Sequence, residues 1–313
     1  MLCVESVIYN IFFGFIFNHD FLYLNLVSSA MIVHLPHLSF MKFGICNEVF
    51  EGWSIDDSIR FVAETGYDAI EIAPFTLAQY VTEVSFSERD RIRKLANDNG
   101  IMVSAIHWVL IKTEGLYMTH TDPVIRQKTS DYFCDLVDFC SDLGAGKIVV
   151  GSPKLRNLLP GVSFEQAWDL AKETFMPAIK RAEDKGVTIC FEPLAPSETD
   201  FINTAEQAIE FVGQCDSSSF KIILDVKAMC SELKSIPEII KDSHPNFAYF
   251  HCNDANLKGP GFGEVDFLPI FKSLKEVNYN GFASVEVFDF EEGPKRIAQD
   301  SLRYMKEVLA NCE

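Results

Sequence analysis

From residue 41 onward, the chain repeats one pattern of polar and apolar positions. A helical stretch ends at glycine, a short and mostly apolar run follows, and the run stops at a polar side chain. Glycine supplies the left-handed residue that closes a helix, and continuous apolar runs are typical of strands buried on both faces of a parallel sheet. The pattern predicts eight strands, at 42–47, 68–72, 101–107, 147–151, 187–192, 220–225, 247–252 and 282–286.

Predicted helix starts fall between these strands. They are marked by capping-box spacing or by an acid before proline, at Ser54 with Asp57, Ser87 with Asp90, Ser163 with Gln166, and Asp122 with Pro123. Eight strands alternating with eight helical stretches predict an α/β fold, a single (β/α)8 TIM barrel over residues 41–313. An open, doubly wound sheet is the alternative, which the lack of a GxGxxG motif after the first strand disfavours.

Residues 1–40 break the pattern. They contain no Lys or Arg, only Glu5 and Asp20 as charged residues, and many aromatic side chains. The missing positive charge disfavours a signal peptide, and polar residues between Asn10 and Asn25 interrupt any transmembrane segment. We therefore predict that the working domain begins at Met41 and that residues 1–40 are an N-terminal extension outside it. A membrane-associating segment is the alternative.

The amino-acid composition limits the kinds of molecule that this protein is expected to bind. The 313 residues include 27 basic and 45 acidic side chains, which give a net charge of −18, and 48% are hydrophobic. These values are ordinary for a globular protein, and the acidic balance argues against nucleic acid or an anionic membrane as partner. Nine cysteines without a CxxC pair indicate reduced thiols and a cytoplasmic protein.

Polar side chains end the predicted strands, and in a barrel these ends converge on one face. The last four strands end, in order, at Glu192, Asp225, His251 and Glu286. Three carboxylates and one imidazole around a common centre favour a divalent cation such as Mn²⁺, Mg²⁺ or Co²⁺.

These residues lie in segments that resemble a known family. The stretch from Met41 to Glu313 is similar to the xylose isomerase-like TIM barrels, the sugar phosphate isomerase/epimerase family, and most of all to the ketose 3-epimerases. The resemblance is carried by residues 190–194 (CFEPL), 224–227 (LDVK), 250–254 (FHCND), 259–267 (GPGFGEVDF) and 285–287 (VEV).

The resemblance implies a metal-dependent isomerase or epimerase acting on a sugar. By that resemblance Glu192, Asp225, His251 and Glu286 are the metal ligands, with Mn²⁺ as the expected ion. Glu192 and Glu286 are also the expected acid/base pair, on opposite faces of the substrate. The expected partner is a small sugar or sugar derivative, and the family allows a homo-oligomer.

Two departures leave the substrate open. The ketose 3-epimerases have histidine three residues after the aspartate ligand and arginine six residues after the histidine ligand, where this chain has Ala228 and Leu257. Lys227 and Lys258 are candidates to supply a cation instead, since a residue two positions after a ligand can face the same side of a strand.

Three more residues are candidate substrate contacts. His107 and Trp108 follow the third strand, where an aromatic ring suits a sugar face. Glu71 ends the second strand and can orient a hydroxyl group. After the fourth strand, Ser152, Lys154 and Arg156 form a charged loop that either binds an anion or is simply solvated.

Other functions remain open. The first alternative is a metal-dependent lyase or dehydratase that removes the same proton from a keto-inositol, keto-sugar or 3-keto-glycoside and then eliminates a group. A nucleic-acid enzyme, like the barrel endonucleases of this superfamily, is disfavoured by the acidic charge and the few histidines after Met41. A non-catalytic sugar-binding barrel would not need the full set of four ligands.

Overall fold

The computed structural model describes residues 41–312, and its eight strands form one closed barrel. All neighbours are parallel and follow sequence order, with β8 returning to pair with β1. The strands are β1 (Lys42–Cys46), β2 (Ala69–Ile72), β3 (Met102–Ile106), β4 (Lys147–Val150), β5 (Thr188–Phe191), β6 (Phe220–Asp225), β7 (Phe247–Cys252) and β8 (Phe282–Val285). The predicted (β/α)8 barrel is confirmed, and each predicted strand forms with ends within one residue.

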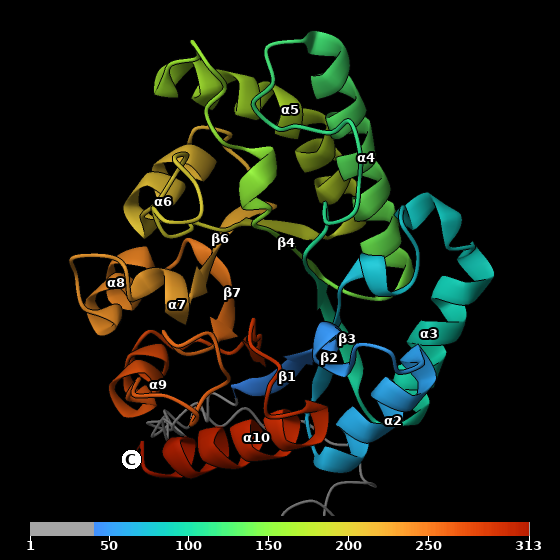
Figure 1. The fold of residues 1–313 in the computed structure, drawn as a ribbon, viewed down its shortest axis with the longest axis vertical. Helices are drawn as coiled ribbons and strands as arrows, with labels where there is room; N and C mark the ends of the chain where they lie inside the picture. Colours follow the sequence, from blue (N-terminus) through green and yellow to red (C-terminus); the bar gives the residue numbers. More distant parts are fainter. Residues whose placement is uncertain (1–40, 313) are drawn as a thin grey trace, which may run out of the picture. The chain divides into compact units, whose positions relative to one another are not determined.

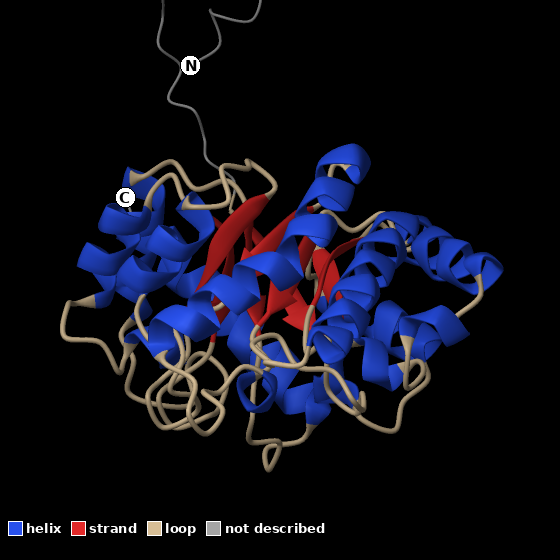
Figure 2. Ribbon diagram, turned by 90° about the horizontal axis from the view of Figure 1, so that it is seen from above, coloured by secondary structure: helices blue, strands red, loops and turns tan. Residues whose placement is uncertain are grey.

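Helices surround the strands, as Figure 1 shows. The long ones are α2 (Ile55–Thr65), α3 (Phe86–Asp98), α4 (Pro123–Asp142), α5 (Phe164–Lys185), α6 (Ala205–Gly213), α8 (Ile236–Ser243), α9 (Phe267–Glu276) and α10 (Pro294–Ala310). A single turn, α7 (Val226–Met229), follows β6 directly. The longer loops gather at one end of the strands (Figure 2), which is the end where barrel enzymes carry their chemistry.

Three of the four predicted helix starts are confirmed. The side chain of the predicted cap accepts a backbone N–H in each of these pairs: Ser54 with Asp57, Asp122 with Val124, and Ser163 with Gln166. The fourth prediction is wrong, because α3 begins at Phe86 and Ser85 caps it by accepting from the N–H of Glu88. Ser85 and Ser87 both have an acid three residues later, so spacing could not distinguish them.

Four small or medium side chains and one tyrosine pack together on the strands. A separate buried cluster contains Ala105, Val149, Cys190, Ile223 and Tyr249, one from each of five strands. Between strands and helices, the larger core is rich in phenylalanine, such as the stacked pair Phe133 and Phe175 with centroids 4.6 Å apart. This packing leaves the polar strand ends as the upper layer of the barrel interior.

The predictions for residues 1–40, including the membrane-associating alternative, lie outside the described residues. Within residues 41–312, no helix combines the length and the apolar character needed to span a bilayer.

Candidate active site

Four strand ends bring the predicted ligand residues together. Glu192 follows β5, Asp225 ends β6, His251 lies in β7 and Glu286 follows β8. One ligand atom from each lies within 4.8 Å of the others, and all four residues are buried. The quartet thus occupies neighbouring positions around half of the barrel, as the order of the strands requires.

Each of these side chains is held by a specific neighbour. Oδ1 of Asp225 accepts the N–H of Ala228 at 2.8 Å, and Oδ2 accepts from Nδ2 of Asn253 at 2.5 Å. Nε2 of His251 lies 3.1 Å from a carboxylate oxygen of Glu71. Oε1 of Glu286 accepts from Nε1 of Trp108 at 2.7 Å.

The remaining atoms fit a divalent cation. Nδ1 of His251 and Oε2 of Glu286 lie 3.1 Å apart, and both are buried without a hydrogen-bond partner of acceptable geometry among residues 41–312. Buried polar atoms are otherwise almost always paired. A Cβ at Gly151 would overlap Oε2 of Glu192, so this glycine leaves room for the carboxylate. Oxygen and imidazole donors without thiolate suit Mn²⁺, Mg²⁺ or Co²⁺.

Burial and mutual repulsion shift the pKa values of the three carboxylates. Burial, with Glu286 next, raises the pKa of Glu192 well above its usual value and that of Asp225 to about 6. Burial also opposes ionisation of Glu286, but the adjacent His251 outweighs it and lowers the pKa. A divalent cation among them would favour the ionised form of all three.

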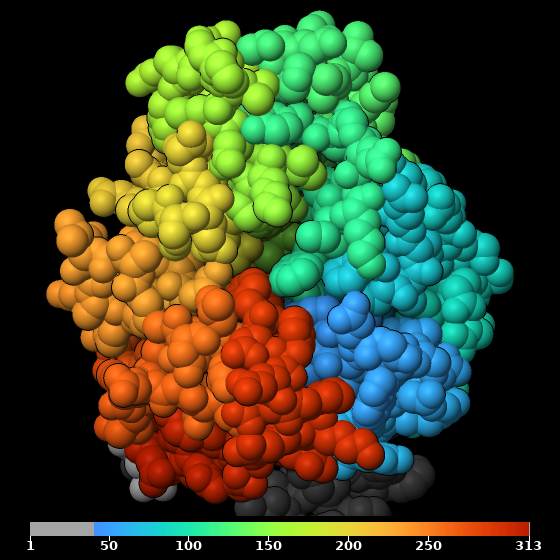
Figure 3. Space-filling model, in the orientation of Figure 1, coloured from blue at the N-terminus to red at the C-terminus, as the bar shows by residue number. Residues whose placement is uncertain are grey.

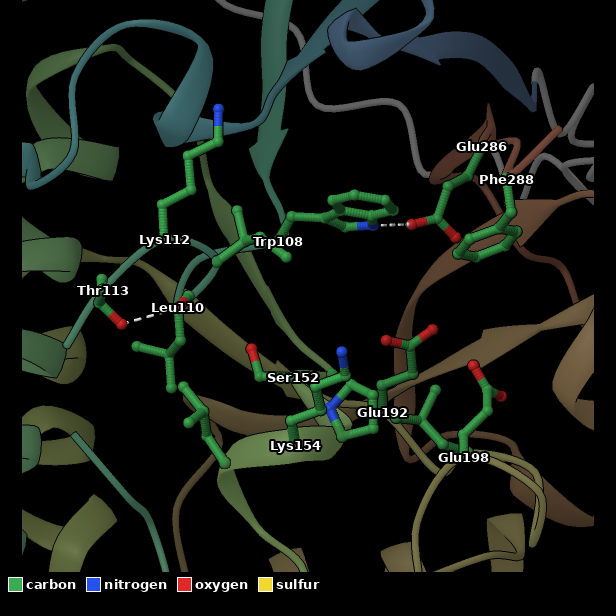
Figure 4. Close-up of a pocket in the computed structure, with 15 residues that line it drawn as sticks. Trp108, Leu110, Lys112, Thr113, Ser152, Lys154, Glu192, Glu198, Glu286 and Phe288 are labelled. Carbon is green, nitrogen blue, oxygen red and sulfur yellow. Dashed lines mark hydrogen bonds between the residues drawn. The ribbon is translucent and has the colours of Figure 1, made fainter. Parts of the chain in front are cut away.

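A cavity of about 390 Å³ opens above Glu192 and Glu286. It is lined by Trp108, Leu110, Ile111, Lys112, Thr113, Gly151, Ser152, Pro153, Lys154, Leu155, Glu192, Leu194, Glu198, Glu286 and Phe288. Figure 3 shows a recess near the centre of the face that carries these loops. In Figure 4, Trp108 and Glu286 lie on one side of the cavity, and Glu192, Ser152 and Lys154 lie on the other.

Trp108, predicted as a substrate contact, lies in the wall of the cavity. Its ring stacks between those of Phe75 and Phe288, with centroids 5.9 and 6.0 Å away. The indole N–H meanwhile reaches Glu286 (Figure 4). The residue therefore joins the aromatic wall to a predicted catalytic carboxylate.

His107 and Glu71, predicted as substrate contacts, have a different place in the structure. Both are fully buried and neither lines the cavity. Nε2 of His107 lies 2.8 Å from Glu48, and the two acids Glu48 and Glu71 overcome burial and raise the pKa of His107 to about 9. Burial would raise the pKa of Glu71, but His251 and His107 lower it to about 2. These side chains support the site from beneath.

The two lysines predicted as substrate contacts lie in different parts of the structure. Nζ of Lys227 donates to Glu198 at 2.7 Å and lies 4.1 Å from the ring centroid of Phe288, so it is bound to two residues of the cavity wall. Lys258 is instead neutralised in a loop outside the cavity, with Nζ 3.1 Å from Glu292 and 3.4 Å from Glu291.

The sequence predicted no role for Glu198 or Glu48, and a different role for Arg156. Glu198 lines the cavity, six residues after Glu192, and Glu48 sits beneath it. Arg156, considered above as an anion ligand, is fully buried: its Nη1 donates to the carbonyl of Glu192 at 2.6 Å and its guanidinium covers Phe191. Burial lowers its pKa to about 10, against the pull of Glu192 and Glu198. Arg156 therefore braces the end of β5.

Known proteins share this barrel. A family model described as xylose isomerase-like TIM barrel matches residues 59–308. The chain belongs to the xylose isomerase-like TIM barrel family. This confirms the resemblance found in the sequence, and the family model covers β2 to β8, including all four residues of the quartet.

Relatives within the family are epimerases by name. The chain is 28% identical over 253 residues to a D-psicose 3-epimerase of Ruminiclostridium cellulolyticum, covering 79% of this chain and 84% of the relative. It is 22% identical to a 3-dehydro-D-guloside 4-epimerase of Escherichia coli, covering 85% and 99%. Among solved structures, D-psicose 3-epimerase from Clostridium cellulolyticum with D-tagatose matches at 25% identity and a TM-score of 0.74, covering 86% and 99%.

Proposed function

We propose that this chain is a divalent-metal-dependent epimerase or isomerase of a ketose or keto-sugar derivative, working in the cytoplasm with Mn²⁺. The observation that carries the proposal is the quartet of Glu192, Asp225, His251 and Glu286, with ligand atoms within 4.8 Å. Two of its members, Glu192 and Glu286, line the cavity. The named activities of the relatives, D-psicose 3-epimerase and 3-dehydro-D-guloside 4-epimerase, support the same substrate class.

In this mechanism the quartet would hold the ion, whose chemistry is to polarise the substrate carbonyl and acidify the neighbouring C–H bond. Glu192 and Glu286 lie on opposite sides of the cavity (Figure 4), so each can reach one face of the same carbon. One carboxylate removes the proton and leaves an enediolate, and the other returns a proton from the opposite face. Return to the same carbon inverts it, whereas return to the adjacent carbon isomerises the sugar.

Other residues of the cavity bind and orient the substrate in this proposal. Trp108 and Phe288 offer aromatic surface to a sugar ring. Lys227 and Glu198 form a paired donor and acceptor at the wall, next to where the relatives' histidine is replaced by Ala228. This pair is our candidate for recognising substrate hydroxyl groups.

The test is solvent isotope exchange. The protein is incubated in D₂O with a panel of ketoses, keto-inositols and 3-keto-glycosides, with Mn²⁺ and after removal of metal by EDTA. We expect an epimer or isomer carrying one solvent deuterium, formed only with metal. A Glu286→Gln variant should lose roughly a thousandfold in rate, in the range of general acid–base effects. Glu291→Gln, an exposed change in the following loop, is the matched control.

The same panel separates the rival reaction. Cleavage or dehydration of a keto-glycoside or keto-inositol, without deuterium in any ketose epimer, would show a lyase and contradict the proposal. Full activity of the Glu286→Gln variant would contradict the assignment of the acid/base pair.

A further inference from the structure

A second group of potential ligands lies on the other side of Glu286. Single ligand atoms of Glu48, His107 and Glu286 lie within 4.8 Å of one another. The exposed fractions of these residues are 3%, 0% and 3%, so all three are withdrawn from solvent. They come from the ends of β1, β3 and β8, whereas the quartet comes from β5 to β8. Glu286 belongs to both groups.

Glu71 lies between the imidazoles of both groups and is hydrogen-bonded to that of His251. Its Oε1 lies 3.1 Å from Nε2 of His251 and 3.5 Å from Nδ1 of His107. The opposite nitrogens face other carboxylates: Nδ1 of His251 lies 3.1 Å from Glu286, and Nε2 of His107 lies 2.8 Å from Glu48. The carboxylate of Glu71 behind His251 is the usual support of a metal-ligating histidine.

An unpartnered atom points to a missing ligand. Oε1 of Glu48 is buried and has no hydrogen-bond partner among residues 41–312. A buried carboxylate oxygen without a partner is strongly disfavoured. The ion pair between Glu48 and His107 satisfies only the other oxygen of Glu48.

The balance of charge favours a second cation. Five buried carboxylates surround the two imidazoles: Glu48, Glu71, Glu192, Asp225 and Glu286. One divalent cation in the quartet offsets two of these five negative charges, and a second divalent cation offsets two more. Glu198 and Lys227, beside the site, pair with each other and cancel.

We propose that Glu48, His107 and Glu286 form a second divalent-cation site, so that the loaded protein holds two ions with Glu286 between them. Two carboxylates and an imidazole favour the same class of ion as the quartet, Mn²⁺, Mg²⁺ or Co²⁺. This goes beyond the proposed function, which needs only the ion of the quartet.

The experiment counts ions and tests whether they are neighbours. The full chain is stripped with EDTA, loaded with excess Mn²⁺, freed of unbound metal and analysed by elemental analysis and by electron paramagnetic resonance. We expect two Mn²⁺ per chain and an exchange-coupled spectrum, with hyperfine lines at half the spacing of an isolated ion. Glu48→Gln, which keeps shape and packing, should bind one uncoupled ion. Asp225→Asn should weaken the other site and also remove the coupling.

The outcomes are distinct. One uncoupled Mn²⁺ per wild-type chain, unchanged in Glu48→Gln, would overturn the second site, leave the proposed function standing and make Glu48 and His107 a simple ion pair. No bound Mn²⁺ in the wild type would overturn both. Because the wild-type spectrum is decisive alone, the test does not depend on the folding of a variant.

Discussion

The indole of Trp108 contacts the site through both its ring and its N–H group. The ring stacks between Phe75 and Phe288, and Nε1 donates to Glu286 at 2.7 Å. Trp108→Phe keeps an aromatic ring but removes the donor. Hydrogen bonds to charged groups contribute about 1.5–3 kcal/mol, so we expect kcat to fall by about 10- to 100-fold with little change in stability. Steady-state kinetics on the substrate found by the panel, with thermal unfolding, measure this.

A second tryptophan gives the control. Nε1 of Trp168 donates to Gln214, far from the cavity lining. Trp168→Phe should leave kcat unchanged and lower only the free energy of unfolding. If Trp108→Phe behaved in the same way as Trp168→Phe, its hydrogen bond to Glu286 would have no part in catalysis.

Individual site residues were predictable where a strand carries them. Glu192, Asp225, His251 and Glu286 could be located because each ends an apolar run. Glu198 could not, because the loop after β5 brings it back over the cavity and no periodicity describes that path. Glu71 and His107 also end strands, but the sequence does not reveal that they lie in a deeper layer than the cavity.

At the scale of the element, the glycine that follows β4 leaves room for the side chain that follows the neighbouring β5. A Cβ at Gly151 would overlap the carboxylate of Glu192, whereas a Cβ at Gly146, before the same strand, meets nothing within 4 Å. We therefore expect Gly151→Ala to keep the barrel folded but displace Glu192. The affinity for Mn²⁺ should fall by about tenfold or more, because a loss of about 1.4 kcal/mol of binding free energy already gives that factor.

Calorimetric titration with Mn²⁺ compares the two glycine variants. Gly146→Ala should bind the metal as the wild type does. Equal Mn²⁺ affinity in Gly151→Ala and Gly146→Ala would show that Glu192 does not need its present position to hold the ion.

Strands were easier to predict than the short elements that place the ligands. Glycine closes α2 and α5 in the left-handed conformation, so the sequence marks where the next strand begins. No such signal announces α7, whose four residues are too few for a helical period. Asp225 both ends β6 and caps α7, because its Oδ1 accepts the N–H of Ala228. The capping thus fixes the carboxylate of this predicted ligand, and only the structure reveals it.

At the scale of the whole molecule, the barrel depends on the closure between β1 and β8. Lys42 to Ile45 pair with Phe282 to Val285 in parallel register. Met41, the residue before β1, also contributes, because it is only 6% exposed and belongs to the core. We therefore predict that the chain from Met41 onward is sufficient to close the barrel.

A chain that starts at Met41 should fold and bind Mn²⁺ like the 313-residue chain. We expect their midpoints of thermal unfolding, measured as barrel unfolding by circular dichroism, to agree within about 2 °C, which corresponds to about 1 kcal/mol for a domain of this size. Saturating Mn²⁺ should raise both midpoints equally, because a ligand of the native state stabilises it by mass action.

A chain that starts at Gly44 is the contrasting variant. It lacks Phe43, whose ring lies 6.1 Å from that of Phe271 and whose N–H donates to Asp68. This shorter chain should fail to close the barrel and lose the metal-induced shift. If the Met41 chain also failed to fold, the predicted start of the working domain would be wrong.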